Sequence, residues 1–149
     1  SEQTLEQFFE RFPEGTYTFE GELKEGSVVT KTITGAADLT HDLLIPVVFK
    51  KIKLPVIEWD EPLEDLDGES LEVVGYELVV ELVVEEDGEE RVFKETTTYP
   101  AGVTKHVVGN RFMKVIKNPP GDILELKIEI LADEPSGNRT ITEEVLIEE

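Results

Sequence analysis

ILELKIEILADEPSGNRTITEEVLIEE, residues 123–149, decides the fold class of this chain. Apolar residues stand at every second position of its first part: Leu124, Leu126, Ile128, Ile130 and Ala132. They alternate with Glu125, Lys127 and Glu129. This period of two predicts a β-strand with one buried face. Residues 133–138 collect turn-forming residues. The apolar side chains of a second strand follow at Ile141, Val145 and Ile147. We therefore expect a terminal hairpin that needs a partner sheet.

The composition limits the classes of protein that need to be considered. A chain of 149 residues suits one domain with an extension and is long enough to bury a core without a staple. It has no cysteine, which excludes disulfides, thiolate zinc sites and cysteine nucleophiles. No run of about 18 apolar residues is present, so we expect no membrane insertion.

The net charge of −20 and the pI of about 4.3 make this an acidic protein. Phosphate groups repel such a surface, so we expect neither nucleic acid nor anionic lipid as a partner. An acidic surface also keeps a β protein from pairing edge to edge. Cation binding and adaptation to a salty medium are the alternative explanations of the charge.

The region before the terminal hairpin supplies the expected sheet partners. Residues 73–86, VVGYELVVELVVEE, form the longest predicted strand, and Asp87-Gly88 is a hairpin signal. One face of that strand is apolar, whereas the other presents Glu77, Glu81 and Glu85 beside two valines. Further strands are predicted at 54–59, 91–99 and 103–109, with a loop at 110–122. Short strands separated by turns predict an antiparallel β-sandwich.

The N-terminal region predicts a helix and a hairpin. Residues 4–12, TLEQFFERF, place their leucine and three phenylalanines on one helical face, and Thr4 and Gln7 form a capping box. We expect that face to be buried over a sheet, with docking of a partner as the alternative. Residues 16–34 predict a β-hairpin that Gly35 ends. The predicted division is an extension at 1–52 and a sandwich at 53–149.

Several motifs in residues 53–149 occur in the order found in a known family. They are a tryptophan in an early strand (Trp59 in PVIEW), the strand opening GYELVVE, Pro119-Pro120-Gly121 before LELKIEILA, and the turn SGNRTITEE. In this order they resemble a fibronectin type III domain. The resemblance implies an immunoglobulin-like β-sandwich that serves as a scaffold without catalytic residues. Leu126 stands where family members usually have a tyrosine, and no Arg-Gly-Asp tripeptide is present.

A second resemblance concerns the N-terminal region. FPEGTYTFEG, residues 12–21, followed by LTH at 39–41, is similar to the segment before such a domain in a group of uncharacterised bacterial proteins. Members of that group carry a signal peptide and a further β segment upstream. The resemblance implies an exported, periplasmic or extracellular setting. The chain begins at Ser1 instead of Met, which fits the C-terminal part of a longer protein.

The sequence contains no catalytic constellation, so we expect that the protein is not an enzyme. His41 and His106 are the only histidines and lack metal-ligand spacing. We expect His106 to face solvent from a strand or to cap a loop. None of the four serines lies in a G-x-S-x-G motif.

The acidic segment 60–72 is the candidate metal site. Its possible calcium ligands are Asp60, Glu64, Asp65, Asp67 and Glu69. Calcium binds several oxygen ligands supplied by flexible loops. The segment lacks the third acidic position and the distal glutamate of an EF-hand. An acidic surface loop is therefore the alternative, and apart from calcium we expect no cofactor.

The first functional hypothesis is a binding or spacer module with a protein partner. Val79 and Val83 are the candidate partner-binding residues, since they are apolar positions on an otherwise acidic face. Edge pairing by β-augmentation is a second route to the same partner. The other hypotheses are a calcium-stabilised adhesion module and a glycan-binding accessory domain. Tyr17 and Tyr99 are the expected exposed aromatic residues of the latter.

Overall fold

The computed structural model describes residues 4–148. Residues 1–3 of the predicted extension and residue 149 of the predicted hairpin lie outside the described residues. The chain divides into two compact units, Ser1–His41 and Asp42–Glu149. The boundary lies at residue 41 instead of the predicted residue 52. Its physical reason is that Leu44 and Val47 are buried in the core of the second unit.

The first unit consists of one helix and one hairpin. Helix α1 (Leu5–Arg11) begins at Thr4, and the predicted capping box with Gln7 is present. Strands β1 (Gly15–Glu25) and β2 (Val28–Leu39) pair in antiparallel fashion as a two-stranded sheet. The prediction that Gly35 ends the second strand was wrong. The strand continues through Gly35 to Leu39. Glycine suits this position because the ring of Phe19, opposite it in β1, occupies the space that a Cβ would need.

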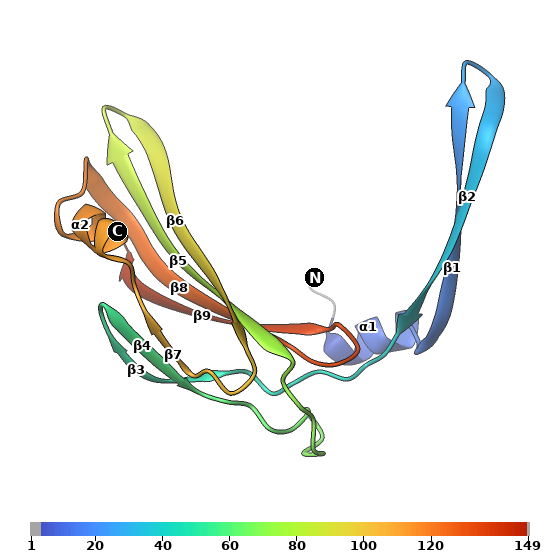
Figure 1. Ribbon diagram of the computed structural model, residues 1–149, viewed down its shortest axis with the longest axis horizontal. Helices are drawn as coiled ribbons and strands as arrows, with labels where there is room; N and C mark the ends of the chain where they lie inside the picture. Colours follow the sequence, from blue (N-terminus) through green and yellow to red (C-terminus); the bar gives the residue numbers. More distant parts are fainter. Residues whose placement is uncertain (1–3, 149) are drawn as a thin grey trace. The chain divides into compact units, whose positions relative to one another are not determined.

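The second unit is mainly β, with antiparallel strands in two sheets (Figure 1). The smaller sheet has the order β3 (Val48–Lys53), β4 (Val56–Asp60), β7 (Lys105–Val107). The larger sheet has the order β6 (Glu89–Pro100), β5 (Gly75–Glu86), β8 (Asp122–Asp133), β9 (Arg139–Glu148). The predicted antiparallel β architecture with a short N-terminal helix is thereby confirmed.

The core lies between the two sheets. The alternating residues predicted to be inside β5 are all buried: Tyr76, Leu78, Val80, Leu82 and Val84. From the facing sheet Ile57 and Trp59 are buried, as the spacing in residues 54–59 predicts. Every buried apolar residue in the described part of the chain belongs to the second unit.

Residues 110–122, predicted as a loop, contain helix α2 (Asn110–Lys117). The helix packs on the core through buried Met113 and through Phe112, Val115 and Ile116, which are partly buried. It follows β7 directly and is succeeded by Pro119 and Pro120. Tertiary packing of this apolar side therefore outweighs the flanking loop signals. In the described part of the chain, neither helix is long and apolar enough to cross a membrane.

The terminal hairpin is formed by β8 and β9. The prediction that Ile141, Val145 and Ile147 continue the buried face in β9 was wrong. Ile141 is 58% exposed, and Val145 and Ile147 are also exposed. A register shift between Leu126 and Lys127 turns Leu146 toward the core instead. The turn itself forms as predicted.

Candidate functional site

A polar network beside the core joins β6 to β7. His106 is buried, and its Nε2 lies 2.8 Å from Glu95 Oε1 while its Nδ1 lies 2.5 Å from the hydroxyl of Tyr99. A neutral ring protonated on Nε2 satisfies both contacts, since Nε2–H donates to the carboxylate and Nδ1 accepts from the hydroxyl. Glu95 Oε2 also accepts from the N–H of Gly109 at 2.9 Å. The network thus fastens the start of α2 to the larger sheet.

Two predictions about this region were wrong. His106 does not face solvent, because it pairs across the sheet with buried Ile57 on the core side of β7. Tyr99 is not an exposed aromatic platform; it is partly buried and its hydroxyl binds His106. Burial, followed by the negative charge of Glu95, raises the pKa of Tyr99. These polar groups bind one another and so hold β6 against β7.

A second polar contact lies close to this network, since Tyr76 pairs with Tyr99 across the larger sheet. Glu61 Oε1 accepts from the hydroxyl of Tyr76 at 3.0 Å and from the N–H of Gly102 at 2.8 Å. Burial first and the Glu61 carboxylate second raise the pKa of Tyr76. The ring of Tyr76 meets the ring of Trp59 edge to face, with centroids 5.4 Å apart. Glu61 therefore holds the loop after β4 against the loop after β6.

The predicted calcium residues do not converge on one point. Asp65 Oδ1 accepts from the N–H groups of Asp67 and Glu69, both at 2.9 Å, so this carboxylate shapes its own turn. Glu64 pairs with Ser70 in an isolated bridge, and Asp60 ends β4. Within residues 4–148, no group of three or more acidic or histidine side chains is placed to hold a metal ion. Calcium binding stays a prediction, which thermal unfolding with EDTA and with added calcium tests.

The predicted partner-binding residues Val79 and Val83 lie on the outer face of the larger sheet. Both are half-buried, and they alternate with Glu77, Glu81 and Glu85 as the sequence predicts. Glu81 stands between the two valines in β5 and pairs with Lys94 at 3.3 Å. Val92 of β6 lies opposite Val83 and is exposed, so the apolar positions of this face include a neighbour from the next strand. Partner binding there stays a prediction.

Every cation of the larger sheet has a carboxylate partner. Lys94 pairs with Glu81, and Arg91 pairs with Glu86. Lys127 lies 3.2 Å from Glu129, and Arg139 bonds Asp133 and also approaches Glu77. Hydrogen bonding to these carboxylates raises the pKa of Lys127 and of Arg139. The positive charge of this sheet is thus compensated within the sheet itself.

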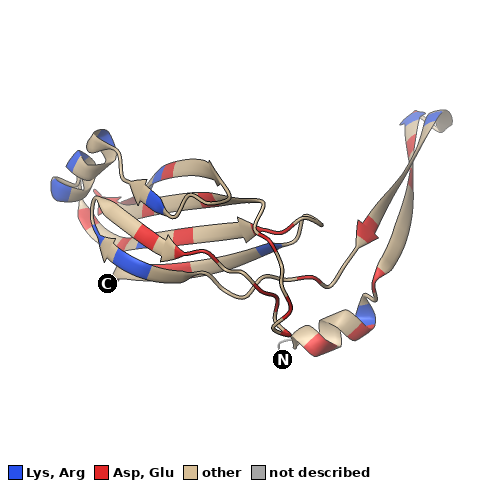
Figure 2. Ribbon diagram, turned by 60° about the horizontal axis from the view of Figure 1, so that its bottom comes forward, with Lys and Arg blue, Asp and Glu red and all other residues tan. Residues whose placement is uncertain are grey.

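The cations of the smaller sheet and of α2 differ, because none of them forms an ion pair with any residue in the range 4–148. They are Lys50, Lys51, Lys53, Lys105, Arg111, Lys114 and Lys117. Helix α2 contains no acidic residue (Figure 2). In a chain with a net charge of −20, these residues are local positive charges, although Lys50 and Lys105 share their surroundings with Glu58 and Asp60. The three lysines at residues 50–53 are visible as a cluster in the sequence. The sequence does not show that they lack ion-pair partners among residues 4–148.

The hairpin of the first unit has one apolar and one polar face. Tyr17, Phe19 and Leu23 of β1 share the apolar face with Ile33 of β2, and all four are between 42% and 60% exposed. The opposite face presents threonine and acidic residues, Glu20 and Glu22 among them. A two-stranded hairpin of this kind has little stability by itself.

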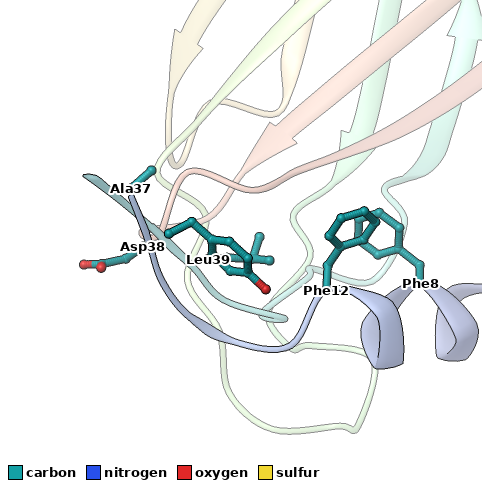
Figure 3. A pocket seen from close by; sticks show the side chains of 6 residues that line it. Phe8, Phe12, Ala37, Asp38 and Leu39 are labelled. Carbon is teal, nitrogen blue, oxygen red and sulfur yellow. The ribbon is translucent and has the colours of Figure 1, made fainter. Parts of the chain in front are cut away.

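An open apolar groove of about 370 Å³ lies beside this hairpin, between α1 and the ends of β1 and β2. Phe8 and Phe12 stand next to each other on α1, with ring centroids 5.0 Å apart, and Leu39 belongs to the β2 side of the groove (Figure 3). No residue of α1 is buried; Phe9 stacks on His41 with centroids 3.9 Å apart. The helix thus adds apolar surface to the unit and leaves most of it accessible.

Comparison with protein-family models, curated proteins and solved structures gave no match. The residues described above are therefore the basis for any functional conclusion.

The sequence pattern predicts neither the network around His106 nor the exposure of the apolar hairpin face. One signal was available for His106, since it alternates with Val108 and both are buried whereas Lys105 and Val107 are exposed. For the hairpin, alternation predicts an apolar face but cannot tell whether another element covers it.

Proposed function

We propose that this chain is a non-catalytic binding module whose N-terminal unit is the binding arm. One observation carries this proposal: one face of the hairpin of residues 15–39 is mostly apolar, with Lys31 opposite Leu23 near its far end, and its large apolar side chains stay about half exposed. Exposed apolar faces of this kind are typical of interaction sites. The core of the second unit contains no residue of the hairpin, so the exposed face is not needed to complete that core.

The body that carries the arm is proposed to be a fibronectin type III-like sandwich. Seven strands in two facing antiparallel sheets support this, as does a buried tryptophan in an early strand. Leu126, at the position expected for tyrosine, is buried, so apolar packing replaces the hydrogen bond of that tyrosine. Helix α2, between β7 and β8, is an addition to the simple pattern of seven strands.

The setting of the protein is proposed from the resemblance of residues 12–21 and 39–41 to exported bacterial proteins. An exported chain would carry a signal peptide encoded upstream of Ser1. Sequencing the reading frame tests this part. A full-length frame without any export signal would contradict it.

Hydrogen exchange on the full chain, at a concentration where it is monomeric, tests the binding arm. The amides of β1 and β2 are expected to exchange far faster than those of β5 and β8, because a hairpin without a covered face opens easily. A companion variant lacking residues 1–41 is expected to keep the melting temperature of the sandwich. Strong protection of the hairpin in the monomer, or unfolding of the shortened chain, would refute the arm.

A further inference from the structure

Two of the edge strands, β1 and β3, carry opposite charges. In the part of the chain that the structure describes, β1 pairs only with β2, and β3 pairs only with β4. A free edge presents backbone N–H and C=O groups that can pair with an added strand. Protein partners use this route when an extended segment adds to a sheet.

Strand β3 presents a basic outer face and an apolar inner face. Lys51 and Lys53 point outward, and neither has an ion-pair partner among residues 4–148. Phe49 and Ile52 point inward opposite Trp59 and Ile57, but they are only partly buried because the sheet ends there. An added strand would thus meet lysine on one side and the edge of the core on the other.

Strand β1 has the complementary pattern. Glu20 and Glu22 lie on one face, while Tyr17, Phe19 and Leu23 lie on the other. Glu22 makes one exposed contact of 3.6 Å with Lys24, so it stays accessible to another cation. The other hairpin strand lacks this match, because the corresponding face of β2 carries threonine and alanine with a single Asp38.

We propose that β1 of one copy adds to the β3 edge of a second copy. Residues paired across a sheet share a face, so one register places Glu20 and Glu22 beside Lys51 and Lys53. The same register places Gly21 opposite Ile52, with Phe19 and Leu23 flanking that pair on the apolar face next to the edge of the core. A shift by one residue would exchange the faces and lose both matches.

The dimensions and the charge favour a second copy over a polyanion. The six residues of β3 span about 20 Å, and the eleven residues of β1 cover that length. A long nucleic acid would extend beyond these lysines onto the acidic remainder of the protein and be repelled. Because donor and acceptor are different surfaces, the contact repeats from copy to copy and generates an open or ring-shaped assembly.

This inference rests on the proposed binding arm and names its partner. It has a clear competitor, since lysines on an edge strand commonly prevent strand addition. The two explanations predict opposite results. Charge reversal at β3 weakens self-association if β1 docks there, whereas loss of a protective charge strengthens it.

Sedimentation velocity over a wide concentration range tests the assembly with the full chain. The wild type is expected to associate with increasing concentration. Lys51→Glu with Lys53→Glu should weaken association about tenfold or more, and so should Glu20→Lys with Glu22→Lys, since each replaces two opposite-charge pairs by like charges. Mixing the two charge-reversed proteins is expected to restore association, because each then offers the charge that the other lacks.

A matched control separates strand addition from general electrostatics. Lys114→Glu with Lys117→Glu changes the net charge equally but on helix α2, away from the β3 edge, and it should leave association unchanged. A wild type that is monomeric at every concentration, stronger association of the β3 variant, or no recovery on mixing would each overturn the assembly. If the wild type is monomeric and its hairpin amides exchange fast, only the proposed second-copy partner is refuted. If it is monomeric and those amides are protected, the proposed binding arm is refuted as well.

Discussion

Replacing Glu95 by alanine is expected to destabilise the sandwich by about 3 kcal/mol. The carboxylate accepts from His106 Nε2–H at 2.8 Å and from the N–H of Gly109 at 2.9 Å. Gly109 is exposed, so water can replace its bond at little cost. The His106 side chain is only 5% exposed, and its donor would be left without a partner in the protein.

The value of about 3 kcal/mol combines two costs at His106: leaving its buried donor unpaired, and losing its hydrogen bond to a charged acceptor. An unsatisfied buried donor costs about 1–3 kcal/mol, and a hydrogen bond to a charged acceptor contributes about 1.5–3 kcal/mol. The two figures overlap at His106, so their sum is an upper limit and about 3 kcal/mol is the expected total. For a domain of this size, that loss lowers the melting temperature by about 10 °C.

Urea unfolding monitored by circular dichroism measures the change at neutral pH. Glu90→Ala is the matched control, because Glu90 lies on the same strand, is exposed and makes no side-chain hydrogen bond or ion pair with residues 4–148. The control should change stability by less than about 0.5 kcal/mol. Adding His106→Phe to Glu95→Ala should recover part of the loss, since both partners are then absent. Equal stabilities of the Glu95 variant and its control would refute the reasoning.

Three further changes test other parts of the sandwich. Ile128→Ala, at a fully buried position, should cost about 3–4 kcal/mol in urea unfolding, and a loss below about 1 kcal/mol would place this residue outside the core. Gly121→Ala should cost about 2 kcal/mol, because its new Cβ would collide with the carbonyl oxygen of Glu85; an unchanged denaturation midpoint would contradict that contact. The raised pKa values of Tyr76 and Tyr99 mean that the unfolded chain loses these protons first as the pH rises. The free energy of unfolding should therefore be steady below about pH 10 and fall above it. Tyr76→Phe should make this fall shallower in urea titrations across that range, and an unaltered slope would contradict the assignment.

The strands with strict alternation were predictable from the sequence. In β5 and in β8, one face is buried along most of the strand. Every second residue on that face must therefore be apolar, and this alternation is visible in the sequence. Strand β9 was harder because it lies at the sheet edge. Its inward residues include Thr140 and Thr142, and a register shift makes Leu146 the residue that packs on the core. Local alternation carries no information about such a shift.

The polar network depends on long-range neighbours. Nothing near His106 in the sequence indicates that Glu95 and Tyr99 of another strand meet its ring. Helix α2 was also not predictable from the local sequence, because its residues Val115 and Ile116 are β-branched and favour strands. The helix forms because its apolar side covers the open end of the core, which only the assembled sheets define. The uncompensated charge of the smaller sheet likewise appears only when every carboxylate has been placed.

The strand order of the larger sheet has a consequence for the rate of folding. Two consecutive hairpins, β5–β6 and β8–β9, lie next to each other and meet through β5 and β8. The first closes on Asp87-Gly88, where both residues have positive φ as a tight two-residue turn requires. Each hairpin can form within microseconds, whereas joining them brings together residues far apart in the sequence and is slower. Replacements at the β5–β8 contact are therefore expected to slow folding, and replacements in β3 to speed unfolding.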